Sequence, residues 1–168
     1  MNNNKLAGGL LVAALALVGV NEGIKYTAYQ DSGGVWTICN GSTKGVKPGD
    51  TATPAECESL LMRELIEHAK PIERIPHPLP DHVIVAWADF CYNIGVPKCQ
   101  GSTGYKLLQQ GRTREACEQI LRWRFVAGRD CFLDENRSFC GGIKNRRQLE
   151  YKLCTGQITV DEAVSIMR

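Results

Sequence analysis

The chain lacks the features of several large classes of protein. Aromatic residues make up only 7% of its 168 residues, and its net charge is only +2. It has no dense basic stripe and no nucleic-acid-binding motif, so nucleic acid is not an expected partner. No internal repeat or low-complexity tract occurs, which argues against a repeat array. The length suits one domain, or two small lobes that share a helix, with a buried core.

Metal-ligand spacing is missing as well. No Cys-x-x-Cys pair exists, and His68, His77 and His82 keep no ligand spacing with the thiols. The sequence therefore predicts no zinc site, and nothing in it requires a cofactor.

Cysteine, in contrast, is abundant. Eight cysteines occur, at positions 39, 57, 91, 99, 117, 131, 140 and 154. An even number in a small chain predicts disulfides and an oxidising compartment. The alternative is reduced thiols that pack as small hydrophobic residues. Short loops favour the pairs Cys91–Cys99 and Cys131–Cys140, and local spacing leaves the other four cysteines unassigned.

Two carboxylates and a hydroxyl follow an uncharged apolar run that ends at residue 20. Asp31 lies nine positions after Glu22, and Thr37 lies six positions after Asp31. Hydrolysis of a glycosidic bond needs a protonated acid on the leaving oxygen and a second carboxylate for the sugar or the attacking water. A carboxyl at an apolar helix end is poorly solvated, which favours its protonated form and makes Glu22 the candidate acid. The alternatives are a helix-end surface acid for Glu22, which the helix dipole disfavours, and a turn residue for Asp31, which is compatible with catalysis.

The surrounding motifs resemble the phage-type lysozymes of glycoside hydrolase family 24, which cut bacterial peptidoglycan. The first matches are Glu22-Gly23, Ala28-Tyr29-Gln30-Asp31 and Gly34-Val35-Trp36-Thr37. Later matches, in the family's order, are Phe90-Cys91-Tyr92-Asn93-Ile94-Gly95, Arg122-Trp123 and Gly142-Ile143…Arg146-Arg147…Glu150. The resemblance covers residues 20–157.

This resemblance implies an α+β fold that is mostly helical and lysozyme-like. Residues 21–168 would form the catalytic domain, with a hairpin-bearing N-terminal lobe (about 21–70), a larger helical lobe (about 81–168) and a cleft between them. It also implies disulfides between Cys39 and Cys57 and between Cys117 and Cys154.

The same resemblance implies roles for individual residues. Glu22 would protonate the β-1,4 bond between N-acetylmuramic acid and N-acetylglucosamine, Asp31 would stabilise the positive sugar, and Thr37 would position the attacking water, with inversion. Tyr92 and Asn93 would line the cleft. Arg146 would pair with Glu22, unless it is an ordinary solvated charge on a helix face.

One motif departs from the family pattern. Where the family has Gly-x-Gly-His-Thr after the catalytic Thr, this chain has Cys39-Asn40-Gly41-Ser42-Thr43. Ser42 therefore replaces a His that braces the cleft, and we expect altered support at this position with the activity retained.

The apolar run at residues 6–20 contains only Leu, Ala, Gly and Val, and Lys5 is the sole charge before it. As a helix it would span roughly 22 Å, less than a ~30 Å hydrocarbon core. A signal peptide cut at Ala14-Leu15-Ala16 would leave too few residues to hold Glu22, and a buried first helix should have a polar face. The third interpretation is a resemblance to the signal-arrest-release segments of some phage endolysins, which leave the bilayer and become the first helix.

That interpretation predicts the partners and the location of the chain. They are the export machinery, the inner membrane through residues 6–20, a holin-type lysis partner and peptidoglycan. The chain would be tethered facing the periplasm and then released into it as a monomer. No Cys lies in residues 1–20, so disulfide exchange with the anchor is not expected.

Local signals predict individual elements. In the N-terminal half they are a hairpin in residues 26–46 and a helix opened by the capping box of Thr53, Pro54 and Glu56, which the prolines at 71, 76, 78 and 80 break. A helix capped by Asp81, a helix over residues 113–125 and a loop over 127–141 follow. The last two elements are a helix that carries Arg146 and ends near Gly156, and a helix opened by Thr159 and Glu162. Trp87 and Phe90 are expected in the core.

Two other functions fit parts of the sequence. One is a cysteine amidase or peptidase that pairs a thiol with His68, His77 or His82, although no such pair has a nucleophile context. The other is a membrane or wall-binding protein on an inactive lysozyme scaffold, for which Ser42 is the motivation.

Overall fold

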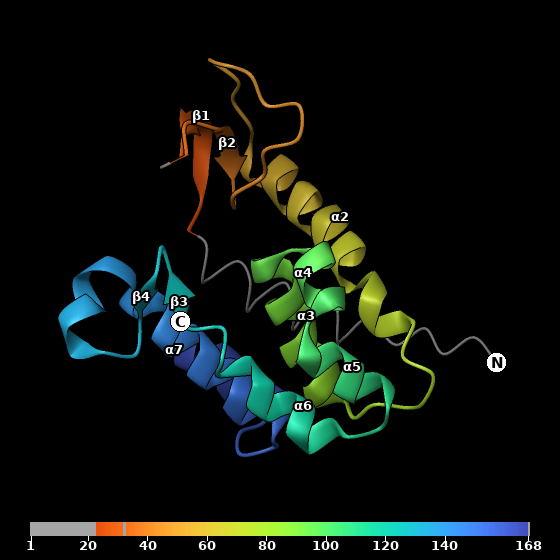
Figure 1. The fold of residues 1–168 in the computed structure, drawn as a ribbon. Coiled ribbons are helices and arrows are strands. Elements are labelled where there is room, and N and C mark those ends of the chain that lie inside the picture. Colours follow the sequence, from red (N-terminus) through yellow and green to blue (C-terminus); the bar gives the residue numbers. More distant parts are fainter. Residues whose placement is uncertain (1–22, 32, 168) are drawn as a thin grey trace.

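A computed structural model describes residues 23–31 and 33–167 of the chain. Two strands, β1 (Lys25–Gln30) and β2 (Trp36–Cys39), stand at one end of a mostly helical body (Figure 1). The helices are α2 (Pro54–Glu73), α3 (Asp81–Ile94), α4 (Val96–Gly101), α5 (Thr103–Gln109), α6 (Thr113–Ile120), α7 (Arg137–Cys154) and α8 (Val160–Met167). The predicted α+β class, mostly helical, is confirmed. Glu22 and the apolar run at residues 6–20 lie outside the described residues.

The predicted N-terminal hairpin is confirmed. Strands β1 and β2 are antiparallel, with Tyr29 opposite Thr37 and Gln30 opposite Trp36, and the register shifts between Lys25 and Tyr29. The segment after the hairpin returns to β1, because the Ala52 amide donates to the Tyr26 carbonyl at 2.9 Å. The hairpin is thus tied to the residues that lead directly into α2.

Helix α2 runs from the hairpin into the helical body (Figure 1). It opens with the predicted capping box, in which the Thr53 hydroxyl accepts from the Glu56 amide and the Glu56 carboxylate accepts from the Thr53 amide. The prediction that Pro71 breaks this helix is wrong, since α2 continues to Glu73. A proline in the last turn removes only one amide donor, so the helix tolerates it there.

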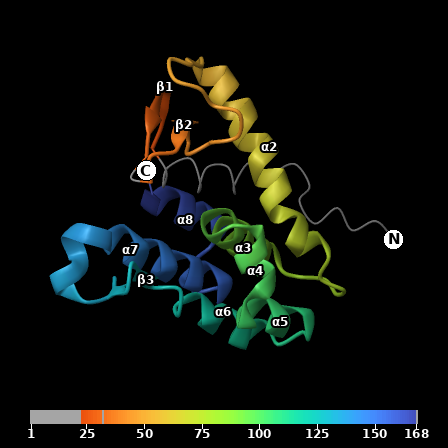
Figure 2. The same cartoon turned by 45° about the horizontal axis from the view of Figure 1, so that its top comes forward.

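Helix α3 is the centre of the core. Every residue from Val83 to Cys91 is buried, and Trp87 and Phe90 are the expected core side chains, at 0% and 1% exposure. The helix packs against α2 and α7, and α8 packs in turn against α7 (Figure 2). The prediction that Asp81 caps α3 is wrong. Pro80 is the N-cap residue. Asp81 lies in the first turn, where its negative charge interacts favourably with the positive end of the helix dipole.

The helix predicted over residues 113–125 is too long. Helix α6 ends at Ile120, and Phe125 begins a short strand. Strand β3 (Phe125–Val126) pairs with β4 (Arg129–Asp130), and the 3₁₀ helix η1 (Asp134–Asn136) follows. The predicted loop over residues 127–141 therefore holds a strand, a 3₁₀ turn and the first residues of α7, which begins at Arg137. Pairing with β4 gives Phe125 a strand conformation where the sequence predicted a helix.

All four expected disulfides are present. They are Cys39–Cys57, Cys91–Cys99, Cys117–Cys154 and Cys131–Cys140. All eight cysteines lie in the described part of the chain, and none of them is free. The cysteine-nucleophile alternative is therefore wrong for this oxidised form. In the stretch from residue 23 to 167, residue 32 excepted, no helix is both long and apolar enough to cross a bilayer.

Candidate functional site

A groove of about 350 Å³ lies where the loop after β2 meets the helical body. Its lining comes from three parts of the chain: Asn40, Gly41, Thr43 and Lys44 after β2, Glu64, Glu67 and His68 on α2, and Tyr92 and Asn93 at the end of α3. The two predicted cleft residues, Tyr92 and Asn93, therefore lie in the same groove. Hydroxyl, amide, carboxylate and imidazole groups make its lining polar, as binding of a saccharide requires.

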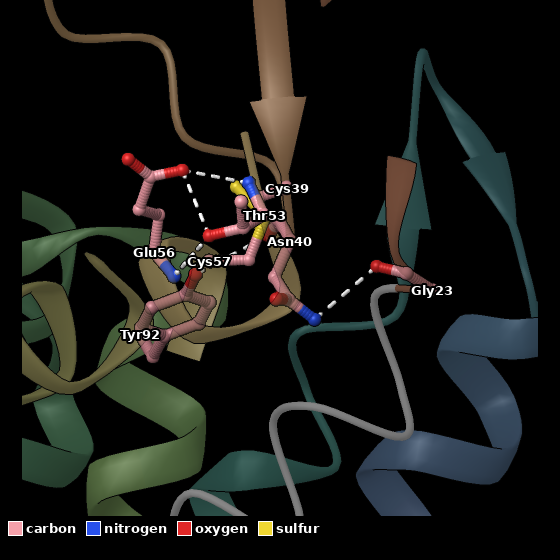
Figure 3. The surroundings of a disulfide bond; sticks show 7 residues. All are labelled: Gly23, Cys39, Asn40, Thr53, Glu56, Cys57 and Tyr92. Carbon is pink, nitrogen blue, oxygen red and sulfur yellow. Dashed lines mark hydrogen bonds between the residues drawn. A yellow bond between two sulfur atoms is a disulfide. The ribbon is translucent and has the colours of Figure 1, made fainter. Parts of the chain in front are cut away.

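Hydrogen bonds join the walls of this groove. The Tyr92 hydroxyl donates to the backbone carbonyl of Asn40 at 3.3 Å and lies 3.5 Å from Glu64 Oε2. The Tyr92 ring also packs against the His68 ring, with centroids 5.2 Å apart. The Asn40 side chain donates through Nδ2 to the carbonyl of Gly23 at 3.2 Å (Figure 3). The groove thus contacts the residue that directly follows Glu22.

Asp31 terminates β1 and organises the hairpin turn. Its Oδ1 accepts from the amides of Gly33 at 2.8 Å and Val35 at 2.9 Å. The side chain is half-buried, and Oδ2 takes part in neither bond. Asp31 is therefore a turn residue, as its alternative interpretation predicted. These turn bonds use only Oδ1 and do not involve Oδ2.

Thr37 lies on β2 and is buried, at 3% exposure. Its hydroxyl donates to the Val35 carbonyl at 2.9 Å, which leaves its lone pairs to accept a hydrogen bond. Three residues later the chain reaches Asn40 and the groove. Neither Thr37 nor Asp31 lines the groove itself.

The loop after Thr37 has an unusual backbone. Cys39 adopts a φ of 58°, a left-handed conformation that is strained for residues other than glycine. The family motif has Gly at this position, which fits the same conformation without a Cβ penalty. In this chain the Cys39–Cys57 disulfide holds the loop on α2 (Figure 3). Ser42, at the position of the family His, is 3% exposed, and its hydroxyl has no hydrogen-bond partner within the described part of the chain.

Arg146 is buried at 6% exposure, so it is not the solvated helix-face charge that was its alternative. Its guanidinium binds both oxygens of Asp89, through Nη2 at 2.9 Å and Nε at 3.2 Å. Glu150 Oε1 lies 3.6 Å from Arg146 Nε, and Glu150 Oε2 accepts from Arg147. Arg147 in turn donates to Asn93, which lines the groove. This buried ionic cluster connects Arg146 to the groove through side chains of α3 and α7.

Glu150 is the most perturbed acid of the cluster. Burial raises the pKa of Glu150 to about 8, while Arg147 acts in the opposite direction and Asp89 adds to the rise. Desolvation outweighs the attraction of the two arginines, so the protonated form of Glu150 is favoured. Its Oε1 lies 3.6 Å from Arg146 Nε and makes no hydrogen bond to any described residue.

The structure brings some of the predicted site residues together. Tyr92 and Asn93 share the groove, and Arg146 reaches it through the ionic cluster. The sequence did not assign lysozyme roles to Asn40, Glu64, His68, Asp89, Arg147 or Glu150. The motif containing Arg147 and Glu150 was a signal for two of them, whereas Asp89 had none. A second cavity of about 440 Å³ at the start of α7 is lined by no predicted catalytic or substrate-binding residue.

Known proteins share both sequence and fold with this chain. The family model described as phage lysozyme matches residues 20–150. The SAR-endolysin of Pseudomonas phage phiKMV is 38% identical over 153 residues, covering 90% of this chain and 92% of that protein. The SAR-endolysin of Enterobacteria phage P21 is 31% identical over 154 residues, covering 88% of each. The solved endolysin from Escherichia coli O157:H7 phage FAHEc1 has a TM-score of 0.74 at 26% identity, covering 90% of this chain and 96% of that one. The lysozyme-like fold expected from the motifs is confirmed.

Proposed function

The chain belongs to the phage lysozyme family, and on that premise we propose that Glu22, Asp31 and Thr37 carry out its hydrolytic reaction. Family membership makes it a lysozyme-type endolysin whose substrate is peptidoglycan, acting in lysis of the host. The bond is the β-1,4 linkage between N-acetylmuramic acid and N-acetylglucosamine. The observation that carries the proposal is the hydrogen bond from groove-lining Asn40 to Gly23, because it fixes the neighbour of Glu22 at the groove.

Glu22 is the general acid in this reaction. Its proton passes to the glycosidic oxygen, the bond to the anomeric carbon breaks, and positive charge develops on the sugar ring. Arg146 is by resemblance the partner of this acid, and its guanidinium is held by Asp89 in the buried ionic cluster. A neighbouring cation limits how far burial can raise the pKa of the acid.

Asp31 and Thr37 act on the opposite face of the sugar. Asp31 keeps Oδ1 on two backbone amides, so the turn holds the carboxylate rigidly while Oδ2 faces the positive charge and accepts a proton from water. The Thr37 hydroxyl already donates a hydrogen bond to the Val35 carbonyl, so it holds the water by accepting a hydrogen bond from it. Attack from this face inverts the anomeric carbon, and such sites separate their carboxyls by about 6.5–9.5 Å.

Release of reducing sugar ends from purified peptidoglycan tests the assignment. Glu22→Gln should abolish release while leaving the fold intact, because the amide has no acidic proton to give to the leaving oxygen. Asp31→Asn and Thr37→Ala should lower turnover strongly with a modest loss of stability. If Glu22→Gln still releases reducing ends, Glu22 is not the acid. If the wild-type chain releases none but still binds the wall, the inactive-scaffold alternative is correct.

We also propose that residues 6–20 act as a weak membrane anchor. The support is the apolar composition of this run, together with the name SAR-endolysin of relatives that align with about nine-tenths of the chain. The export machinery would insert it, the enzyme would face the periplasm, and depolarisation by a holin-type partner would release it. Fractionation of cells before and after depolarisation should move the intact protein from membrane to periplasm. A protein that is always soluble, or cut after Ala16, would refute the anchor.

A further inference from the structure

The segment at residues 39–43, which departs from the family motif, contains two buried polar residues, Ser42 and Asn40. Ser42 stands at the position of the family His, yet its buried hydroxyl has no partner among the residues that the structure describes. It therefore does not brace the groove. Two positions earlier, Asn40 is equally buried, at 2% exposure, and it contacts both the helical body and Gly23.

Asn40 joins two parts of the molecule through different groups. Its backbone carbonyl accepts from the Tyr92 hydroxyl of α3 at 3.3 Å, and its side-chain amide donates to the Gly23 carbonyl at 3.2 Å. Figure 3 shows the amide pointing away from α2 toward the start of the hairpin. A side-chain amide that is almost fully buried needs a hydrogen-bond partner, and the Gly23 carbonyl is a partner of this one.

The loop that presents Asn40 is held on several sides. Ile38 and Ser42 exchange two backbone hydrogen bonds, at 2.9 and 3.0 Å, which close the loop around Asn40. The preceding residue, Cys39, is bonded covalently to Cys57 on α2. Asn40 therefore has a fixed base from which to orient the Gly23 peptide.

We infer that Asn40 is a positioning residue for the proposed acid, because it fixes the peptide at Gly23, the residue that directly follows Glu22 in the chain. The inference rests on the proposed role of Glu22 as the acid. An acid must lie within hydrogen-bond reach of the leaving oxygen, and a misplacement of about 1 Å can lower the rate about a hundredfold. Asn40 takes over, by a different contact, the support that Ser42 does not supply.

Asn40→Ala and Asn40→Asp test this assignment in the full-length chain. Alanine removes the donor, and aspartate keeps the shape but places an acceptor against the Gly23 carbonyl. Both should lower kcat on purified peptidoglycan at least tenfold while KM stays within about twofold, since a link that positions the acid acts on the reaction step, and eight other residues also line the groove. If the buried aspartate variant fails to fold, the alanine variant alone decides.

Asn136 provides a matched control. Its side-chain amide also donates to a backbone carbonyl, that of Asp130, at 2.9 Å, and it does not line the groove. Asn136→Ala should keep kcat within twofold of the parent. A folded Asn40→Ala with unchanged kcat, a loss confined to KM, or an equal kcat loss in Asn136→Ala would each overturn the inference. Glu22→Gln is measured beside them, because activity in that variant would remove the proposed acid itself.

Discussion

The hairpin lobe and the helical body are held together by different means. In the helical body, one large cluster of buried apolar residues extends over α2 to α8, with Leu65, Trp87 and Phe90 among its fully buried members. Among the residues that the structure describes, the buried apolar cluster at the hairpin consists of Ile38, Cys39 and, from α2, Cys57. Packing therefore fixes the helical wall of the groove, while a disulfide, a capping box and a few hydrogen bonds fix the hairpin wall. The catalytic residues proposed here depend on the second, more lightly held wall.

Truncation of one core residue in each region should give the largest effect. Leu108→Ala, in the fully buried core of the helical body, should lower the free energy of unfolding by about 2–5 kcal/mol. Ile38→Ala should lower it by about 2 kcal/mol or less, because its cluster can collapse around the change. Urea denaturation measures both. Equal losses would contradict the distinction between a helical body held by packing and a hairpin held by a disulfide, a capping box and hydrogen bonds.

Removal of single disulfides sharpens the comparison. Replacing Cys39 and Cys57 together by alanine should lower the free energy of unfolding by about 3 kcal/mol, and so should replacing Cys117 and Cys154. Only the first pair lies beside Asn40, so only its removal should also reduce kcat in protein that remains folded. If replacing Cys117 and Cys154 reduces kcat as much as replacing Cys39 and Cys57 does, the hairpin disulfide has no special role in activity.

The sequence predicted the lightly held region well, because its signals are local. A capping box within four residues and a Gly-rich hairpin are visible in single short windows, and the family's layout supplied the Cys39–Cys57 pair. The contacts that organise the site are not local. Asp89 and Arg146 are 57 positions apart, and Asn40 and Gly23 are 17 apart. Neither pair has a spacing that the sequence alone could recognise.

Two of the wrong predictions have different origins. The helix expected over residues 113–125 ends early because Phe125 pairs with Asp130 in a short hairpin, a local structure that the prediction missed. Pro71 was expected to end a helix that in fact continues to Glu73, and there the Pro71 carbonyl accepts from the Tyr105 hydroxyl at 2.9 Å, 34 positions away. In the second case a contact distant in sequence supports the local conformation.

The buried ionic cluster gives the helical body a dependence on pH. The pKa of Glu150 is raised to about 8 in the folded chain, so the native state binds an extra proton above the acid's ordinary pKa. The contribution of Glu150 to the free energy of unfolding is fully present below the ordinary pKa of a glutamate. It decreases as the pH rises above that value and is lost as the pH passes through about 8. The free energy of unfolding should therefore fall by about 1.4 kcal/mol per pH unit from this group, between about pH 5 and 8.

Urea denaturation over this pH range checks the expected slope. Glu150→Gln mimics the protonated carboxyl and should remove the slope, while the exposed Glu135→Gln should leave it in place. A slope that persists unchanged in Glu150→Gln would show that another group causes it.

The smallest effect on stability is expected from removal of the two capping boxes, one beside the hairpin and one in the helical body. Thr53 caps α2 beside the hairpin, and Thr159 caps α8 in the helical body with the same pair of bonds to a glutamate three positions on. Thr53→Ala and Thr159→Ala should each lower the free energy of unfolding by about 1 kcal/mol.

Their effects on turnover should differ. Thr53 follows Ala52, whose amide is bonded to β1, so loosening this helix start also loosens the hairpin wall of the groove. Thr53→Ala should therefore lower kcat as well as stability, whereas Thr159→Ala should lower stability alone. Thermal melts paired with reducing-end assays separate the two quantities. Equal kcat in both variants would mean that the helix cap stabilises α2 without helping to hold the site.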